Sequence, residues 1–354
     1  MPKFSGSLRP NELFAAIYNM IISQQVFSDN IKGVKSQLVD KARTDGTLYG
    51  DQKLYYATDA LKSAEWGNDA EAANLLALHR PKAPECQAII LDKFRQISLT
   101  TDNYLSKRAW GDEGTFSSFN SVMKGWVSDT KRIYDATTYN AFFGTCKATK
   151  GRQNLTITID KEAGAPSEAQ QVAEYMANLF EEMTDISRDF NDYGFLRSYN
   201  YGDIKVVWNS KALNKIKKID LPTIFHKDEL MDKFSETLPS RYFGEVIATA
   251  SGVNSGKGDG KTIRTLVEKD YGTVHCFPGD LIPNNQAFED GEAYQEKADI
   301  LCKVYVKLPP FMSSFEVGTS FFNPKSLTEN NYLTWGHNTL EKLDNYPFIT
   351  IKKA

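Results

Sequence analysis

The stretch of residues 43–102 is too poor in large apolar side chains to form a hydrophobic core of its own. Its apolar residues gather in two short runs with strand character, 54–56 and 88–91. Turn-forming residues interrupt the remainder at Gly46, Gly50, Gly67, Pro81 and Pro84. Ordering a residue costs about 1 to 2 kcal/mol of backbone entropy, which burial must offset. We therefore predict that residues 46–100 form a long projecting excursion that must pack against something else.

Residues 115–143 carry the first long helical pattern, with apolar side chains spaced three, four and seven residues apart. Such a length far exceeds the average helix of about three turns, so we predict one long spine helix. Gly125 lies inside this pattern and costs about 1 kcal/mol relative to alanine, which weakens the case for an unbroken helix.

A second helix is predicted to begin after Ser167, because Ser167 and Gln170 have the spacing of a capping box. Apolar side chains then recur in steps of three and four at Val172, Met176, Leu179, Met183, Ile186 and Phe190. This stripe lasts fewer than three heptads, so packing on a sheet is favoured over a coiled coil.

The remaining elements are short and follow no regular strand–helix repeat. Strands are predicted at 155–159, 204–208, 245–249, 300–307 and 348–352, and helices at 8–27, 210–218 and 227–234. The helix at 8–27 would be an N-terminal arm or, equally well, a peripheral core helix. The residues between the last two strands are predicted to be irregular. The mixture predicts the α+β class.

Composition excludes several classes of protein. The 354 residues include 41% hydrophobic residues, which is ordinary for a globular chain of about two domains and unlike a disordered one. A formal net charge of −3 provides no global positive field, so any DNA contact should be local or weak. The apolar run at 13–22 is too short to span a bilayer and makes a poor signal peptide.

The four cysteines form no Cys-x-x-Cys pair, so the sequence predicts neither a disulfide framework nor a zinc site, and synthesis in a reducing cytosol follows. His275 and Cys276 are neighbours, and neighbours in a strand point to opposite faces, so they would not form a nucleophile–base pair. His79, His226 and His337 stand alone, without metal-ligand spacing. We predict no catalytic, cofactor-binding or metal-binding residue and no enzymatic activity.

The glycine-rich loop at 252–262 has the context of a phosphate-binding loop, between a strand and a helix-like segment. Its spacing departs from a Walker loop, because only three residues separate Gly256 from Gly260 and Ser255 occupies the position that would give four. A strand ending at Asp92 that could hold magnesium lies upstream of this loop instead of downstream. The simpler interpretation is a surface loop with lysines at its tip.

Charged and aromatic residues offer further candidates. The lysines Lys211, Lys215, Lys217 and Lys218 could contact phosphate, and Glu181 and Glu182 form an acidic pair, but both groups are typical of solvated helix faces. Aromatic residues make up 12% of the chain and gather late in it, at Phe311, Phe315, Phe321, Phe322, Tyr332 and Trp335. Aromatic side chains anchor subunit interfaces, and they also fill ordinary cores, so both interpretations stay open.

The order of predicted elements resembles the tailed-phage major capsid protein family, whose architecture is the Hong Kong 97 fold. A nearer resemblance, to the small podovirus capsid proteins of the phi29 kind, is carried by two stretches. In residues 97–120 an aromatic-bearing strand leads through Trp110 and Gly111 into the spine helix. In residues 204–213, IKVVWNSKAL, a strand turns into a helix as is common in that family's A-domain.

The resemblance implies an N-terminal arm at 1–45, an extended E-loop at 46–100 and a P-domain with the spine helix at 101–165. It further implies an A-domain at 166–300 and return strands of the P-domain at 301–354. The implied function is self-assembly, as pentamers and hexamers, into the icosahedral head shell enclosing packaged double-stranded DNA. The implied location is the virion, after synthesis in the host cytoplasm. A separate scaffolding protein and a portal are the implied partners, with no membrane.

Two other functions remain open from the sequence. One is a nucleotide-binding enzyme that uses the loop at 252–262, which binding of a fluorescent nucleotide would favour. The other is a receptor- or carbohydrate-binding virion protein that uses the late aromatic stretch, which glycan binding without shell formation would favour.

Overall fold

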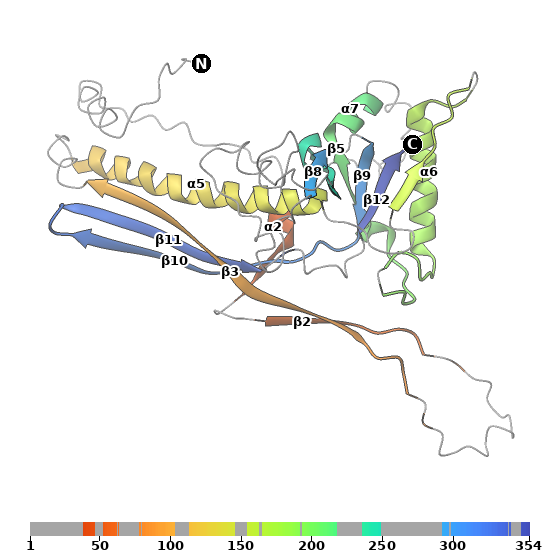
Figure 1. Ribbon diagram of the computed structural model, residues 1–354, viewed down its shortest axis with the longest axis horizontal. Helices are drawn as coiled ribbons and strands as arrows, with labels where there is room; N and C mark the ends of the chain where they lie inside the picture. Colours follow the sequence, from red (N-terminus) through yellow and green to blue (C-terminus); the bar gives the residue numbers. More distant parts are fainter. Residues whose placement is uncertain are drawn as a thin grey trace.

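A computed structural model describes residues 38–46, 52–61, 63, 78, 80–102, 113–145, 154–162, 165–191, 193–217, 236–248, 292–296, 299–338, 340 and 348–354. Two five-stranded sheets organise this part of the chain. One sheet lies along the long helix α5, and the other belongs to a second body at one end of that helix (Figure 1).

The first sheet has the strand order β1-β10-β11-β3-β2. Its strands are β1 (Arg43–Asp45), β2 (Gln52–Ala57), β3 (Glu85–Asp102), β10 (Phe311–Asn323) and β11 (Thr328–Asn338). All neighbours pair antiparallel except β1, which runs parallel to β10. The 18-residue strand β3 pairs with β2 through its first part and with β11 through the rest.

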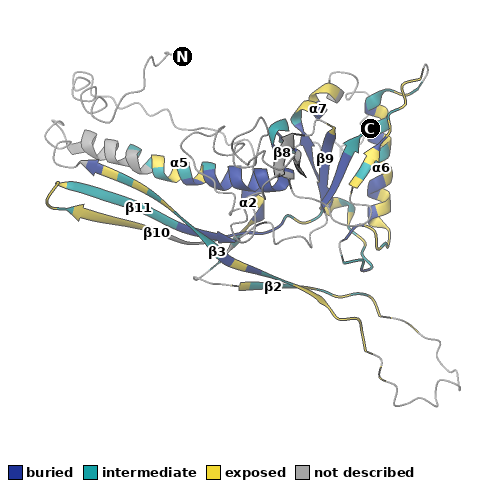
Figure 2. Ribbon diagram, in the orientation of Figure 1, coloured by how far each residue is buried: buried dark blue, intermediate teal, exposed yellow. Residues whose placement is uncertain are grey.

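The helix α5 (Glu113–Thr145) covers this sheet, and its C-terminal part supplies much of the first hydrophobic core. Buried rings of α5, including Tyr134, Tyr139 and Phe143, belong to one cluster with Trp335 of β11 and Phe311 of β10. The short helix α2 (Leu38–Ala42) adds three buried side chains to the same cluster. Figure 2 shows that burial along α5 rises towards the second body.

The second sheet has the strand order β4-β12-β9-β5-β6. Its strands are β4 (Asn154–Ile157), β5 (Lys205–Asn209), β6 (Glu236–Leu238), β9 (Ile300–Tyr305) and β12 (Phe348–Lys353). The helices α6 (Glu168–Thr184) and α7 (Ser210–Lys217) join it in a second core. The 3-10 turns η2 (Tyr201–Asp203) and η3 (Ser240–Tyr242) and a two-stranded pair, β7 (Gly244–Ala248) with β8 (Glu292–Glu296), complete the described elements.

The two long helices confirm their sequence signals. Helix α5 runs through Gly125 without a break, because the packing of its apolar face outweighs the propensity cost of one glycine. Helix α6 begins at the predicted capping box, in which Ser167 and Gln170 bond to each other's backbone N–H groups. Helix α6 ends at Thr184, so the predicted extension to Phe190 is wrong, and Ile186 beyond it is exposed.

The prediction of an irregular stretch between the last two strands is also wrong, because this stretch contains the long hairpin β10–β11. Strands predicted at 155–159, 204–208, 245–249, 300–307 and 348–352 correspond to β4, β5, β7, β9 and β12, and the helix at 210–218 to α7. The helices predicted at 8–27 and 227–234 lie outside the described residues.

The last part of the chain divides between the two sheets. The hairpin β10–β11 belongs to the sheet beside α5. Strands β9 and β12 belong to the second sheet, where they pair with each other, and where β9 also pairs with β5 and β12 with β4. The side chains of β9 are buried throughout the strand, as expected for a central strand covered on both faces.

Candidate functional site

The ribbon formed by β2 and residues 85–90 of β3, which we call the β2–β3 ribbon, has two different faces. Antiparallel pairing places Leu54 opposite Ala88 and Tyr56 opposite Cys86. These residues share one face with Ile90, and Leu54 and Tyr56 are 49% and 64% exposed. Large apolar side chains that share an exposed face are typical of a contact surface for another molecule.

The opposite face of the β2–β3 ribbon is turned towards the body of the protein. Ile89 of this face is buried in the first core, and Tyr55 packs against the same cluster. Residues 46–100 are predicted to lack a core of their own and to pack against something else, and the structure shows what their inner part packs against. The inner part of this segment, including Ile89 and Leu91, joins the core beside α5, because period-two alternation gives β3 a buried face.

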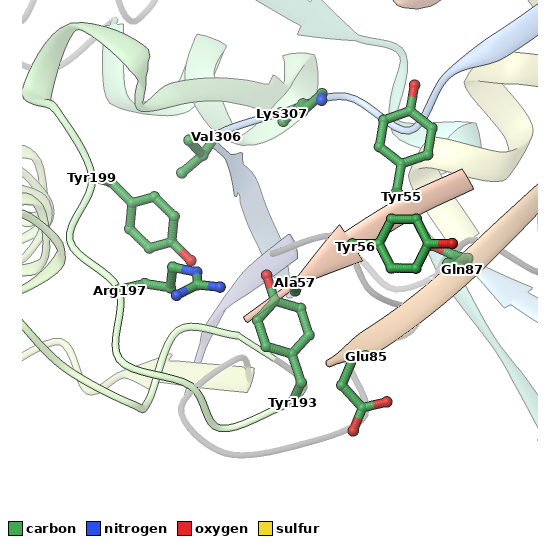
Figure 3. Close-up of a pocket in the computed structure, with 10 residues that line it drawn as sticks. All are labelled: Tyr55, Tyr56, Ala57, Glu85, Gln87, Tyr193, Arg197, Tyr199, Val306 and Lys307. Atoms are coloured by element: carbon green, nitrogen blue, oxygen red, sulfur yellow. The ribbon is translucent and has the colours of Figure 1, made fainter. Parts of the chain in front are cut away.

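A cavity of about 270 Å³ lies between the β2–β3 ribbon and the second body (Figure 3). Its lining residues are Tyr55, Tyr56, Ala57, Glu85, Gln87, Tyr193, Arg197, Tyr199, Val306 and Lys307. The Lys307 ammonium lies 4.9 Å from the centre of the Tyr55 ring, and the Arg197 guanidinium lies 5.7 Å from that of Tyr193. Burial raises the pKa of Tyr199 to about 12.

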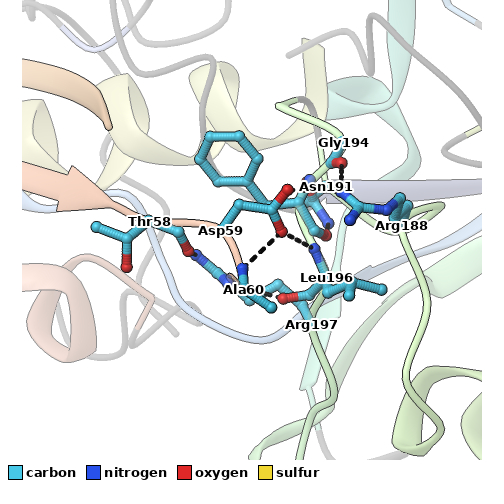
Figure 4. A network of polar contacts seen from close by, with 9 residues as sticks. Thr58, Asp59, Ala60, Arg188, Asn191, Gly194, Leu196 and Arg197 are labelled. Atoms are coloured by element: carbon cyan, nitrogen blue, oxygen red, sulfur yellow. Dashed lines mark hydrogen bonds and ion pairs between the residues drawn. The ribbon is translucent and has the colours of Figure 1, made fainter. Parts of the chain in front are cut away.

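Just beyond β2, Asp59 fastens the chain to the loop of residues 187–197 (Figure 4). Its carboxylate accepts hydrogen bonds from Arg188 Nη1 at 2.8 Å, from the Leu196 N–H at 3.0 Å and from the Ala60 N–H at 2.9 Å. The hydrogen bond from Arg188, followed by that from Leu196, lowers the pKa of Asp59 to about 2. We call Asp59 and these three donors the Asp59 clamp.

The far part of the hairpin β10–β11 presents a second exposed apolar group. Phe321 and Phe322 are 60% and 51% exposed, and Val317 and Leu327 are also exposed. Residues 317–323 of β10 pair with β11 on one side, but within the described residues β1 pairs with β10 only at residues 311–313, so the other side of β10 is an open edge at 317–323. An open strand edge with exposed aromatic side chains can pair with another chain. Trp126 of α5 is a further large exposed apolar residue.

Of the histidines and the cysteine considered for catalysis, only His337 belongs to the part of the chain that the structure describes. The loop at 252–262 and His79, His226, His275 and Cys276 lie outside the described residues. His337 is fully buried and lies 2.9 Å from the Tyr134 hydroxyl, as a satisfied core histidine would. Among the residues that the structure describes, no group of three or more His, Cys, Asp or Glu side chains could hold a metal ion.

Four of the charged candidates are exposed on helices, and nothing is described of the side chain of Lys217. Glu181 and Glu182 are exposed on α6, and Lys211 and Lys215 are exposed on α7, while Lys218 lies outside the described residues. Burial raises the pKa of the Cys302 thiol far above its ordinary range, so this thiol is unreactive in the folded chain. No helix in the described part of the chain is both long enough and apolar enough to cross a membrane.

Comparisons with known proteins identify the fold. No protein-family model and no curated protein matches the chain. A chain in the capsid structure of Staphylococcus phage Andhra aligns with 100% of this chain and 88% of its own length, with a TM-score of 0.56 at 10% identity. This is the fold of a phage capsid protein.

A second match is a chain in the structure of the head fibre and inner core protein gp22 of native bacteriophage P68. It covers 92% of this chain and 88% of its own length, with a TM-score of 0.59 at 8% identity. The α+β class and the resemblance to phage capsid proteins inferred from the order of elements are thereby confirmed. At such low identity the likeness concerns the fold, so function must be argued from the surfaces.

The Asp59 clamp was not found by sequence reasoning. Asp59 and Arg188 are 129 residues apart and belong to no local motif. The only sequence signal is the position of Asp59 directly after a strand, where aspartate is common in turns. By contrast, the two apolar runs that predicted the excursion, 54–56 and 88–91, supply the apolar side chains of the outward face, Leu54, Tyr56, Ala88 and Ile90.

Proposed function

We propose that this chain is a structural virion protein that self-assembles into the icosahedral head shell enclosing packaged phage DNA, and that it is not an enzyme. The observation that carries the proposal is the outward face of the β2–β3 ribbon. Leu54, Tyr56 and Ile90 are exposed there in a chain with a phage capsid-protein fold. Burying one such side chain contributes about 1.5 to 3 kcal/mol, which a second copy of the chain would supply.

The arrangement of edges supports assembly through unlike surfaces. Strand β2 lies at one edge of the first sheet, and the far part of β10 lies at the other within the described residues. Contacts between two different surfaces of one chain generate rings when the rotation closes. Each contact can be weak, because a subunit in a shell makes many of them at once.

We further propose the division of the chain that the resemblance implies, with one adjustment. Residues 1–45 form the N-terminal arm, 46–100 the E-loop, 101–165 the P-domain with α5, and 166–300 the A-domain. The hairpin β10–β11 supplies the return strands of the P-domain. The pairing of β9 with β5, and of β12 with β9, favours grouping these two strands with the A-domain.

The proposed partners are other copies of the chain, as pentamers and hexamers, together with a separate scaffolding protein and a portal. Packaged double-stranded DNA would be confined and contacted weakly, because a chain with a net charge of −3 lacks the phosphate-neutralising surface of a DNA-binding protein. The proposed location is the virion, after synthesis in the host cytoplasm, with no membrane partner.

The test is to express the chain with and without a candidate scaffolding protein and to examine the products by sedimentation and electron microscopy. We expect rings and closed shells from the unaltered chain. Leu54→Glu should reduce the yield of shells by an order of magnitude or more, because it would place a charge in an apolar contact. The matched control is Asn178→Glu, which adds the same charge at an exposed position of α6. A compact monomer at every concentration, or full assembly by Leu54→Glu, would contradict the proposal.

A further inference from the structure

Both limbs that continue the β2–β3 ribbon contact the same loop of the second body. On the limb that leaves β2, the Thr58 carbonyl accepts a hydrogen bond from Arg197 Nη2 at 2.7 Å, next to the Asp59 clamp. On the limb that returns to β3, the Lys82 ammonium lies 4.3 Å from the centre of the Phe195 ring. The loop of residues 187–197 therefore contacts the chain on each side of the ribbon's outer end.

This loop is braced from within. Ser187 and Arg197 exchange two backbone hydrogen bonds of 2.9 Å, which close its base. The buried side-chain amide of Asn191 donates to the Phe195 carbonyl at 2.8 Å and accepts from the Phe195 N–H at 2.9 Å. Gly194 has a φ of +64°, a left-handed conformation that glycine adopts without strain. Phe195 is fully buried, so its ring holds this part of the loop against the protein.

The contacts of the Asp59 clamp are of the strong kind. A carboxylate that accepts from a guanidinium and from backbone N–H groups forms charge-assisted hydrogen bonds, which are about twice as strong as neutral ones. Arg188 is itself held, because its Nη1 also donates to the Gly194 carbonyl at 2.7 Å. Arg188 is half-exposed, so water screens the ion pair, and the backbone donors contribute alongside it.

The β2–β3 ribbon is thus attached at two places. At its inner end β3 continues into the first sheet, where it pairs with β11. At its outer end the limbs meet the loop of residues 187–197, and Figure 1 shows this end leaving the first sheet and passing beneath the second body. A two-stranded ribbon bends and twists readily by itself, so a second attachment is what fixes its direction.

We propose that Asp59 and Arg188 are positioning residues for assembly: they fix the direction in which the two limbs leave the body, and so determine where a neighbouring copy meets the ribbon's outward face. This inference rests on the proposed shell function. Its partner is a second copy of this chain, and the two residues act through the placement of Leu54 and Tyr56 without contacting the neighbour themselves.

The first measurement tests the clamp in the unassembled protein. Hydrogen exchange would be followed by mass spectrometry for Asp59→Ala, Asp59→Asn and Arg188→Ala. We expect exchange in residues 58–61 and 194–197 to become roughly tenfold faster in Asp59→Ala, with a smaller effect in Asp59→Asn, which keeps an acceptor for the backbone donors. Exchange in α6 should not change. The matched control is Glu168→Ala, which removes an ion pair with Lys353 elsewhere on the second body.

The second measurement compares the shells by electron microscopy. If the inference is right, Asp59→Ala and Arg188→Ala produce open or irregular shells from folded protein, the double variant is no worse than either single one, and Glu168→Ala produces normal shells. Normal shells from Asp59→Ala would overturn the inference, whether or not exchange at the clamp rises. Irregular shells from Glu168→Ala would also overturn it, because general destabilisation would then explain the result. Absence of shells from the unaltered chain would refute the proposed function instead.

Discussion

Gly144 lies in the last turn of α5, at a point where a methyl group has no room. A Cβ added at Gly144 would lie 1.9 Å from the Tyr242 carbonyl oxygen and 2.5 Å from the Tyr242 carbonyl carbon. Both atoms belong to the backbone of η3, and Tyr242 is buried in the first core. No side-chain rotation can relieve this contact, so Gly144→Ala must push η3 and the end of α5 apart.

The size of the effect follows from two opposing contributions. Forcing a methyl group into packed backbone typically costs about 1 to 3 kcal/mol, and a rigid neighbour places the cost at the upper end. Alanine is favoured over glycine inside a helix by about 1 kcal/mol, which offsets part of this cost. We expect Gly144→Ala to lower the free energy of unfolding by about 2 kcal/mol.

The matched control lies in the same helix. A Cβ at Gly125 would have no atom within 4 Å, so Gly125→Ala should raise the free energy of unfolding by the propensity gain, about 1 kcal/mol. Unfolding of the unassembled protein would be followed by circular dichroism during heating and in urea. For 354 residues each kcal/mol corresponds to roughly 1 to 2 °C in Tm, so the two variants should differ by several degrees. Equal or higher stability of Gly144→Ala would refute the packing argument.

Three further predictions concern buried or clamped groups. Lys303 is buried, and its Nζ donates a hydrogen bond to the Phe143 carbonyl near the end of α5 at 2.9 Å. Because Lys303→Met leaves this carbonyl without its donor, it should lower the free energy of unfolding by about 1 to 3 kcal/mol, which a lower urea midpoint would report. The lowered pKa of Asp59 means that the clamp's contribution to stability is complete above about pH 4 and is lost as the pH falls through about 2. A carboxyl resonance titrating near pH 4 would contradict this. Cys86 is exposed and should react with a thiol reagent in the folded protein, whereas Cys302 should react only after unfolding, which mass spectrometry would detect.

Local signals in the sequence were sufficient for the helices. The Ser167–Gln170 capping box and the apolar stripe that follows it are contained within one short segment, and α6 formed where they indicated. The stripe continued to Phe190 in the sequence although the helix ended at Thr184, because Phe190 reaches the second core from the loop instead. Apolar spacing indicates which residues are buried more reliably than it indicates where an element ends.

The hairpin β10–β11 was missed because it lacks the alternation that identifies a strand. Residues 317–322 are all exposed, and residues 328–334 are all half-buried, so neither strand has one buried face and one exposed face over these stretches. Its pairing with β3 is fixed from far along the chain, with Trp335 opposite Arg95. The Asp59 clamp was missed for a related reason, since Asp59 and Arg188 are 129 residues apart and only the tertiary fold brings them together.

The two faces of the β2–β3 ribbon explain why only part of the excursion packs against its own chain. Alternate residues in a strand point to opposite faces, so Tyr55 and Ile89 meet the protein's own core, and Leu54 and Tyr56 are left for another molecule. A shift of one residue in the register of β2 would exchange the two faces and bring Lys53 and Ala57 outward. The core thereby fixes which side chains face a neighbour. The Asp59 clamp acts on a different variable, the direction of the ribbon, so losing the clamp and losing the outward side chains should impair assembly in distinguishable ways.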